Sequence, residues 1–333
     1  MVLQDIFLRH HCFPEGYLFS KWNQEGITLE IKEQIRKLAY DSGMSLCGFA
    51  NIERFAESPV ELRPDGVLPG CKTVTVIGVR LLDGVIQANF RDFEDGRKDL
   101  KGLYGTYGYT ILPNFQLTKA CYDIAQLIEV QTEEIATPCS TGPMTNGRQV
   151  SLRHCAVAAG LGEFGWMSIV LTPQFGPRNR FGAILTTAEI EPDPLYSGKK
   201  LCNPKTCGIC TKVCPSHALS GYGEEGKRTV HMEDRTFEYC SVDMRKCFVV
   251  EERLRKKYGA PDDYATSDTP SFEELKRAQE RAYASDLGIQ HVPSWYCGRC
   301  LSYCPTGEWG KKFRKTGLSK GFHNDQLYPE SEN

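Results

Sequence analysis

Apolar positions in the first 190 residues follow two periods, one typical of helices and one typical of strands. Residues 29–41 and 114–130 repeat apolar side chains at three and four positions, which predicts two amphipathic helices. Three shorter runs are almost continuously apolar and predict strands, at residues 46–50, 73–81 and 181–190. Helices and strands mixed along one half of a chain predict an α+β fold with a layered core.

A third helix is predicted over residues 151–160, and the glycine-rich turn Gly-Leu-Gly-Glu-Phe-Gly begins at its last residue. Residues 191–200 contain two prolines and one glycine and show no periodicity, so we place a domain junction there. The expected division is a first domain of residues 1–195 and a second of residues 196–333. The second domain is expected to be irregular up to about residue 250.

Composition narrows the class of protein. Of 333 residues, 41% are hydrophobic and 25% are charged, which is typical of a folded globular protein and excludes a disordered chain. The formal net charge of −2 argues against a protein that coats nucleic acid. No apolar run approaches the ~18 residues that span a bilayer, and the first twenty residues lack a secretory or twin-arginine pattern. We therefore expect no membrane association and a cytoplasmic location.

Cysteine is the unusual component, with 15 residues, of which nine lie between Cys202 and Cys304. An odd number of thiols in a long chain does not fit a secreted disulfide scaffold, whereas clustered thiols in a reducing compartment commonly bind metal. Residues 202–215 have the spacing C-x4-C-x2-C-x3-C-P, and residues 297–305 have the spacing C-x2-C-x3-C-P.

Runs of this kind are typical of bacterial two-cluster ferredoxins, in which the last cysteine of a run binds the other cluster. A zinc ribbon is the alternative, but its two C-x2-C pairs are commonly ~15–20 residues apart, and here they are far more widely separated. Zinc would also leave the cysteines before the two prolines without a role. Two [4Fe–4S] clusters need eight ligands and the runs supply seven, so Cys240 and Cys247 both remain open as the eighth.

Residues 153–193 (RHCAVAAGLGEFGWMSIVLTPQFGPRNRFGAILTTAEIEPD), together with the two cysteine runs, resemble the cobalamin-dependent reductases, which comprise epoxyqueuosine reductases and reductive dehalogenases. The resemblance is specific over residues 146–305 and looser over residues 29–130. It implies a nitroreductase-like core that binds cobalamin, with a C-terminal ferredoxin-like module that holds two [4Fe–4S] clusters beside it.

The resemblance also implies a set of cluster ligands. The sequence Asp243-Met244-Arg245-Lys246-Cys247 matches the D-x-R-x-C pattern of the family, which makes Cys247 the eighth ligand. One cluster would then bind Cys202, Cys207, Cys210 and Cys304, and the other would bind Cys214, Cys247, Cys297 and Cys300. The family begins its first run with C-x2-C where this chain has C-x4-C, so Cys202 departs from the pattern.

The implied activity is a reduction in which an external donor such as ferredoxin or flavodoxin passes electrons through the two clusters to cobalamin, for reductive cleavage of a small-molecule substrate. Asn146 stands where epoxyqueuosine reductases carry a proton-donating Asp, and an amide cannot act as a general acid. The segments GLGE and LTPQFGPRNR are closer to reductive dehalogenases, which tend to use a Tyr as donor. We therefore expect a non-respiratory, reductive dehalogenase-like enzyme. The alternatives are an epoxyqueuosine reductase that acts on tRNA and a non-catalytic iron–sulfur electron-transfer protein.

Further site residues follow from the resemblance. The expected cofactor-binding residues are Asn146, Arg153, Gly160, Gly162, Gly165 and Trp166. The catalytic candidates are Arg153, His154, which could titrate near neutrality, and Tyr107. Each has a structural alternative: a hydrogen-bonding histidine, a turn packed by the tyrosines of YGTYGY (104–109), and a tight helix-to-strand turn for the glycines.

The C-terminal part of the chain carries a predicted helix over residues 272–287, which Ser271 and Glu274 introduce with a capping pattern. Five Lys and Arg residues follow between positions 311 and 320. They could contact the phosphates of tRNA or dock an acidic electron carrier. A solvated chain end fits the slightly negative net charge better.

Overall fold

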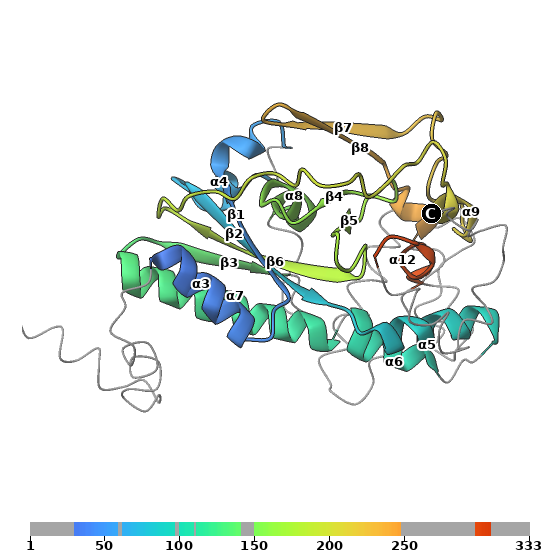
Figure 1. Cartoon of the computed structure of the whole chain (residues 1–333), viewed down its shortest axis with the longest axis horizontal. Coiled ribbons are helices and arrows are strands. Elements are labelled where there is room, and N and C mark those ends of the chain that lie inside the picture. Colours follow the sequence, from blue (N-terminus) through green and yellow to red (C-terminus); the bar gives the residue numbers. More distant parts are fainter. Residues whose placement is uncertain are drawn as a thin grey trace, which may run out of the picture.

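The computed structural model describes residues 30–58, 62–96, 100–109, 111–140, 150–247 and 297–307. Figure 1 shows these residues as a mixed arrangement of helices and strands around one four-stranded sheet. Three expectations lie outside them and concern Asn146, the helix over residues 272–287 and the basic segment 311–320.

The central sheet is antiparallel, with the strand order β1-β2-β6-β3. Its strands are β1 (Leu46–Asn51), β2 (Thr73–Arg80), β6 (Asn179–Thr186) and β3 (Ala136–Ser140). Nearly every side chain of β2 and β6 is buried, which explains why their sequences are apolar without alternation. The three predicted strands are confirmed with small shifts of their ends, whereas β3 was not foreseen.

Two helices cover one face of the sheet, α3 (Ile31–Asp41) and α7 (Ile111–Thr132), and both extend along it in Figure 1. Their apolar stripes share a hydrophobic core with the strands. Gly182 of β6 allows α7 to approach closely, because a Cβ atom there would lie 2.5 Å from Sγ of Cys121. Both helices are confirmed, and Cys121 is a buried core thiol, as its place in the apolar stripe of the helix predicts.

The opposite face carries α8 (Leu152–Ala158), which ends where Gly160 takes a left-handed conformation with φ +73°. The short hairpin of β4 (Glu163–Phe164) and β5 (Val170–Leu171) follows directly. The predicted helix and its glycine-rich exit turn are therefore confirmed.

A second hairpin lies in the part that was expected to be irregular. It consists of β7 (Lys227–Met232) and β8 (Arg235–Cys240). Phe237 and Tyr239 pack into the same hydrophobic core as α8 and β4, so this hairpin joins the first half of the chain although it lies beyond residue 195.

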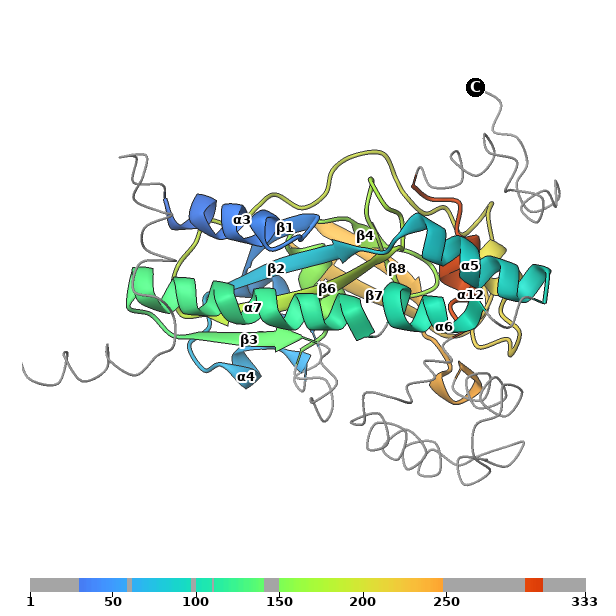
Figure 2. The same ribbon diagram turned by 90° about the horizontal axis from the view of Figure 1, so that it is seen from below.

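Helices from distant parts of the sequence meet at one end of the sheet, as Figures 1 and 2 both show. They are α5 (Asp83–Glu94), α6 (Lys101–Leu103), α9 (Ile209–Lys212) and α12 (Arg299–Tyr303). Asn89 of α5 donates to the carbonyl oxygen of Cys297 (3.2 Å) and to the hydroxyl of Ser302 (3.1 Å), which fixes α12 against α5. Two single-turn helices, η1 (Ile52–Phe55) and α4 (Pro64–Val67), follow β1.

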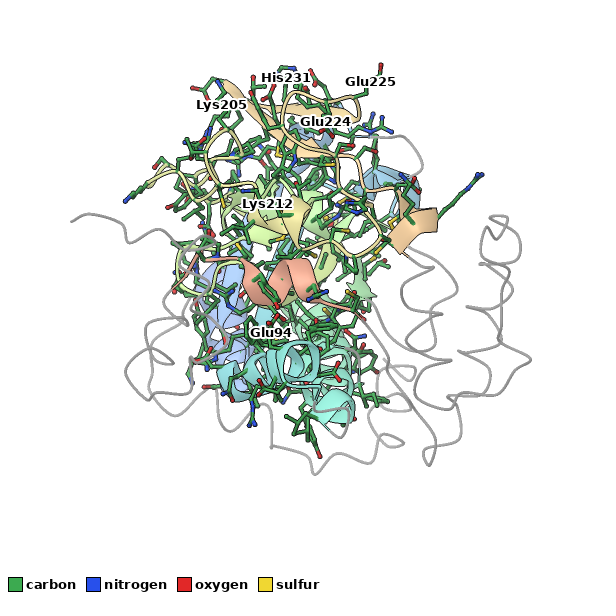
Figure 3. The ribbon with its side chains drawn as sticks, turned by 90° about the vertical axis from the view of Figure 1, so that its right-hand side faces the viewer. Glu94, Lys205, Lys212, Glu224, Glu225 and His231 are labelled. Carbon is green, nitrogen blue, oxygen red and sulfur yellow. The ribbon has the colours of Figure 1, made fainter. Side chains whose placement is uncertain are left out.

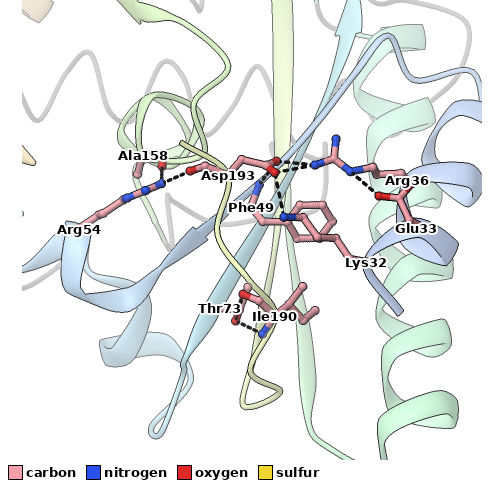
Figure 4. A network of polar contacts seen from close by, with 9 residues as sticks. All are labelled: Lys32, Glu33, Arg36, Phe49, Arg54, Thr73, Ala158, Ile190 and Asp193. Carbon is pink, nitrogen blue, oxygen red and sulfur yellow. Dashed lines mark hydrogen bonds and ion pairs between the residues drawn. The ribbon is translucent and has the colours of Figure 1, made fainter. Parts of the chain in front are cut away.

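The junction predicted at residues 191–200 contains neither helix nor strand. Asp193 joins this segment to α3 and β1. Its carboxylate accepts hydrogen bonds from Arg36 at 2.6 and 2.8 Å and from the backbone N–H of Phe49, and it forms an ion pair with Lys32 at 3.0 Å (Figure 4). The buried guanidinium of Arg54 donates to the carbonyl oxygen of the same Asp193.

The α+β class expected from the sequence is confirmed by this arrangement. Within the described residues, the longest apolar helices fall short of what is needed to cross a bilayer.

Candidate functional site

Eight cysteines from three segments of the chain gather at the end of the sheet where α9 and α12 meet. The thiols of Cys202, Cys207, Cys210 and Cys304 are electrostatic neighbours: burial, and then the three other thiols, raise the pKa of Cys210 to about 12. The pKa of Cys300 is raised by burial and then by the neighbouring thiols of Cys297, Cys247, Cys210 and Cys214, in that order. The last cysteine of each run therefore lies toward the cysteines of the other run.

The two C-x2-C loops have the same local backbone. Gly208 precedes α9 and Gly298 precedes α12, and each takes a left-handed conformation with φ +63°. Glycine adopts this conformation at little cost, and in each loop it stands directly after the first cysteine of the pair. The two halves of the cysteine-rich region are thus built alike around α9 and α12.

The thiols do not converge on one point. Among the described residues, no three His, Cys, Asp or Glu side chains are close enough to hold a single metal ion. Tetrahedral zinc would require such convergence, with Zn–S bonds of ~2.3 Å. A [4Fe–4S] cubane takes its four thiolates at separate corners and holds them farther apart. A donor set of eight thiols is of the kind that holds [4Fe–4S] clusters.

Backbone amides point at two of these sulfur atoms. The N–H of Trp166 donates to Sγ of Cys202 (3.3 Å), and the N–H of Ala218 donates to Sγ of Cys214 (3.2 Å). The carboxylate of Glu163 accepts the N–H groups of Leu201 and Cys202. The segment that carries Cys202 is therefore held against the glycine-rich turn, although its spacing in the sequence departs from the family pattern.

The two cysteines left open by spacing have different surroundings. Cys240 is fully buried, and its sulfur accepts the N–H of Ser220 at 3.2 Å. Cys247 is half-buried at the end of the segment 243–247 and is an electrostatic neighbour of Cys300.

The glycines of the turn pack against the protein's own backbone. A Cβ atom on Gly160 would lie 2.2 Å from the carbonyl oxygen of Pro194, and one on Gly162 would lie 1.9 Å from that of Leu171. The structural alternative, a tight helix-to-strand turn, is thus sufficient to explain both glycines. The indole of Trp166 is buried and donates to the carbonyl oxygen of Ser220 at 2.7 Å, on the side of the cysteines.

Arg153 and His154 lie next to each other on α8 but face different partners. Arg153 donates to the carbonyl oxygen of Ser168 at 2.6 Å and to its hydroxyl. His154 is buried between the hydroxyl of Ser151 (2.6 Å) and that of Tyr239 (3.1 Å). Burial, and then the charge of Arg153, lower the pKa of His154 to about 4, so it is neutral at pH 7 and does not titrate where the sequence alone suggested.

Tyr107 belongs to a π-helical segment, η4 (Tyr104–Tyr109), which replaces the turn expected for YGTYGY. Its side chain is half exposed, whereas Tyr104 is fully buried against Gly298 of the second cysteine run. Arg180 lies over the ring of Tyr109 at 4.5 Å. Single-turn π-helices inside α-helices occur frequently at functional sites. The backbone of this segment is therefore a second reason, besides its tyrosines, to consider it part of the site.

Three residues that the sequence did not single out contact the candidate site: Glu163, Tyr239 and Arg178. Arg178 lies in the LTPQFGPRNR stretch and donates to the carbonyl oxygen of Cys304 at 3.0 Å. The stretch was noted only for its resemblance, and no local pattern links its arginine to a cysteine 126 residues away.

Tetrachloroethene reductive dehalogenase from Desulfitobacterium hafniense is 35% identical over 233 residues, which are 67% of this chain and 37% of the dehalogenase. The enzyme of the same name from Sulfurospirillum multivorans is 34% identical over 165 residues, which are 49% of this chain and 25% of that enzyme. The chain thus matches little more than a third of the length of the first relative and a quarter of the length of the second. No family model matches it.

Solved structures give more distant matches. Epoxyqueuosine reductase from Streptococcus thermophilus has a TM-score of 0.43 and 19% identity, over 59% of this chain and 55% of that protein. A catabolic reductive dehalogenase has a TM-score of 0.47 and 17% identity, over 83% of this chain and 39% of that protein. It is the sequence identity to the tetrachloroethene enzymes that shows kinship. The chain belongs to the superfamily of cobalamin-dependent reductases that includes the reductive dehalogenases.

Proposed function

We propose that this protein is a cobalamin- and [4Fe–4S]-dependent reductase that cleaves a small organic substrate in the manner of a non-respiratory reductive dehalogenase. The observation that supports the proposal is the gathering of eight cysteines from three segments beside the Gly160–Gly165 turn. In this proposal Cys202, Cys207, Cys210 and Cys304 hold one cluster, and Cys214, Cys247, Cys297 and Cys300 hold the other.

The chain's own groups prepare these sites. Amide donors to sulfur, such as Trp166 N–H to Cys202, favour the reduced form of a cluster, because they stabilise added negative charge. Glu163 positions Cys202 by accepting its N–H, and Asn89 positions Cys297 by donating to its carbonyl oxygen. These contacts join groups of the chain itself and orient the cysteine segments, which lowers the cost of assembling a cluster.

The corrinoid part of the proposal depends on kinship, since the glycines of the turn are already explained by packing. When bound, a corrinoid supplies a strongly nucleophilic reduced cobalt. The overall reaction takes two electrons and one proton, breaks the carbon–halogen bond, and releases halide and the hydrogenated product. Arg153 and Tyr107 are the candidates for binding substrate and delivering the proton. Neutral His154 is suited to orient Ser151 and Tyr239 instead.

Electrons have to arrive from a separate donor protein. Residues 194–223 carry Lys199, Lys200, Lys205 and Lys212 and no Asp or Glu. Cys207 is exposed on this segment, and Figure 3 shows Lys205 and Lys212 on the face at this end of the molecule. An acidic carrier such as ferredoxin or flavodoxin fits the charge of this segment, and Figure 3 shows Glu94, Glu224 and Glu225 on the same face.

For the arrangement of the chain, we propose a nitroreductase-like first domain of residues 1–195 and a ferredoxin-like second domain of residues 196–333. The β7–β8 hairpin packs against the first domain and links the two.

Anaerobic purification and reconstitution test the proposal. We expect about eight iron atoms per chain, four for each cluster, and binding of added cobalamin as a shift of its visible spectrum. Reduced viologen should then drive halide release from tetrachloroethene, after which the sequence relatives are named, or from 3-bromo-4-hydroxybenzoic acid, which is bound in a solved structure of a catabolic reductive dehalogenase. A protein with eight iron atoms and no cobalamin binding would be an electron-transfer protein. Restoration of queuosine in cells that lack epoxyqueuosine reductase would establish the tRNA activity instead.

A further inference from the structure

Arg178 is the largest side chain among those described that is almost completely buried, with 1% of its surface exposed. It lies two residues after Gly176 and immediately before β6. A guanidinium stays charged at any pH at which proteins fold, and burying a charge is costly unless it is well bonded. The chain therefore maintains a positive charge inside the molecule at this position.

Three acceptors of hydrogen bonds from this guanidinium lie in and just after the last cysteine run. Arg178 donates to the carbonyl oxygen of Cys304 at 3.0 Å, to that of Leu301 at 3.4 Å, and to that of Thr306. These carbonyls lie at and just beyond the end of α12, so the guanidinium is held beside Cys304. Its charge also acts on the Cys304 thiol, where it opposes the increase in pKa that burial causes.

Two glycines shape the backbone around the guanidinium. Gly176 has φ +57° and Gly307 has φ +92°. A Cβ atom on Gly176 would lie 1.9 Å from the carbonyl oxygen of Thr306 and 2.9 Å from Nη2 of Arg178, and one on Gly307 would lie 3.0 Å from the same nitrogen. Two segments that are 131 positions apart thus close around one buried charge.

We propose that Arg178 raises the reduction potential of the cluster held by Cys202, Cys207, Cys210 and Cys304, an inference that rests on the proposed function. One-electron reduction by an external donor adds one negative charge to a cluster and makes or breaks no bond. A fixed positive charge stabilises that added charge, and it does so strongly where water is excluded.

Glu163 and Arg299 are other described charges close to the cysteines. The carboxylate of Glu163 lies near Cys202 with the opposite sign, but it is hydrogen-bonded by two amides that partly offset it. Near the other set of cysteines, Arg299 is paired with Glu94 at 3.8 Å. The electron is therefore expected to rest on the cluster that adjoins the Gly160–Trp166 segment.

The test is a redox titration of the anaerobically reconstituted holoprotein, followed by electron paramagnetic resonance so that each cluster is measured separately. We expect Arg178→Gln to lower one midpoint potential and leave the other unchanged. The expected loss is at least about tenfold in the equilibrium constant for reduction, or about 59 mV for one electron. Arg178→Lys keeps the charge and should keep most of the potential.

Arg54→Gln is the matched control. Arg54 is also buried, and it donates to the carbonyl oxygens of Ala158 (2.6 Å) and Asp193 (2.7 Å) and to the carboxylate of Glu233 (2.7 Å). This substitution removes similar hydrogen bonds, so it should reduce stability and shift neither potential.

Each outcome supports or contradicts the proposed effect of Arg178 on the reduction potential. Two clusters with unchanged potentials in Arg178→Gln would overturn the inference and leave Arg178 as a cap of α12. Arg178→Met is a second neutral variant. Iron loss in both neutral variants, with full iron in the lysine variant, would support a role of the positive charge at the cluster. Iron loss in all three variants would contradict that role. A wild-type protein that binds no clusters would instead overturn the proposed function.

Discussion

Individual side chains at this site act mainly through what surrounds them. Cys240 and Cys247 have the same chemistry, yet one sulfur is fully buried with a backbone N–H donor, and the other lies toward Cys300. His154 keeps both ring nitrogens in hydrogen bonds with hydroxyl groups and is thereby isolated from solvent. Two predictions follow from these surroundings.

The first prediction distinguishes the two cysteines. Cys247→Ser should remove one cluster and reduce the iron content of the reconstituted protein by about half, since four iron atoms belong to each cluster. Cys240→Ser is the control and should retain all the iron, because the Cys240 sulfur is fully buried and already accepts the backbone N–H of Ser220. Iron analysis measures both. The opposite result would make Cys240 the eighth ligand.

The second prediction concerns pH. The pKa of His154 is lowered to about 4 from an ordinary value of 6.5, so between these values the unfolded chain binds the extra proton. The contribution of His154 to the free energy of unfolding is therefore fully present above pH 6.5 and is lost as the pH decreases toward 4. From pH 7 to pH 5 the expected loss is about 2 kcal/mol. Urea unfolding of the wild type and of His154→Asn checks this, since the variant should lack that part of the slope.

Helices and strands were predicted well where burial alone shapes the sequence, as in α7 and β2. They were missed where contacts over long distances matter. β3 is short and has a proline, and the β7–β8 hairpin has an exposed outer face, so neither carries a strong apolar period. What joins the elements, the carboxylate of Asp193 and the glycines of the turn, also depends on partners distant in sequence.

Asp193→Asn should lower the free energy of unfolding by about 1–3 kcal/mol, because it leaves Arg36 and Lys32 without their carboxylate in a partly buried network. Asp41→Asn is the control. It removes an exposed pair with Lys37 on the same α3 helix, and such pairs contribute about 0.5 kcal/mol or less. Equal losses in the two variants, measured by chemical denaturation, would contradict the assigned role of Asp193.

Gly162→Ala should be far more damaging than Gly43→Ala. A methyl group at Gly162 would overlap the carbonyl oxygen of Leu171 and force β4 and β5 apart. Gly43 has φ +82° with open space around it, so alanine there adds only backbone strain of about 1–2 kcal/mol. Thermal unfolding of both variants measures the difference, and a mild effect at Gly162 would show that the turn can relax.

On the scale of the whole molecule, the sheet with its helices has large apolar cores, whereas the cysteine-rich end has a smaller one in which several thiols take part. Metal binding and folding are coupled where a preformed core is small.

Iron removal should therefore loosen the cysteine-rich end and leave the sheet folded. In limited proteolysis of the chelator-treated protein, we expect new cleavage in residues 201–219, while residues 73–80 and 179–186 stay protected. Mass spectrometry of the fragments, with the holoprotein as control, gives the result. Cleavage throughout the sheet would show that the clusters support the entire fold.

The sequence by itself determined the α+β class, the principal helices and strands, and the set of cysteines, because apolar period and cysteine spacing are local properties of a chain. Only the tertiary structure decided that the glycines fit against Pro194 and Leu171, and that His154 is buried and neutral. It also placed the charge of Arg178 beside Cys304. These are contacts between segments far apart in the chain, and their energies come from burial and distance, which no local pattern records.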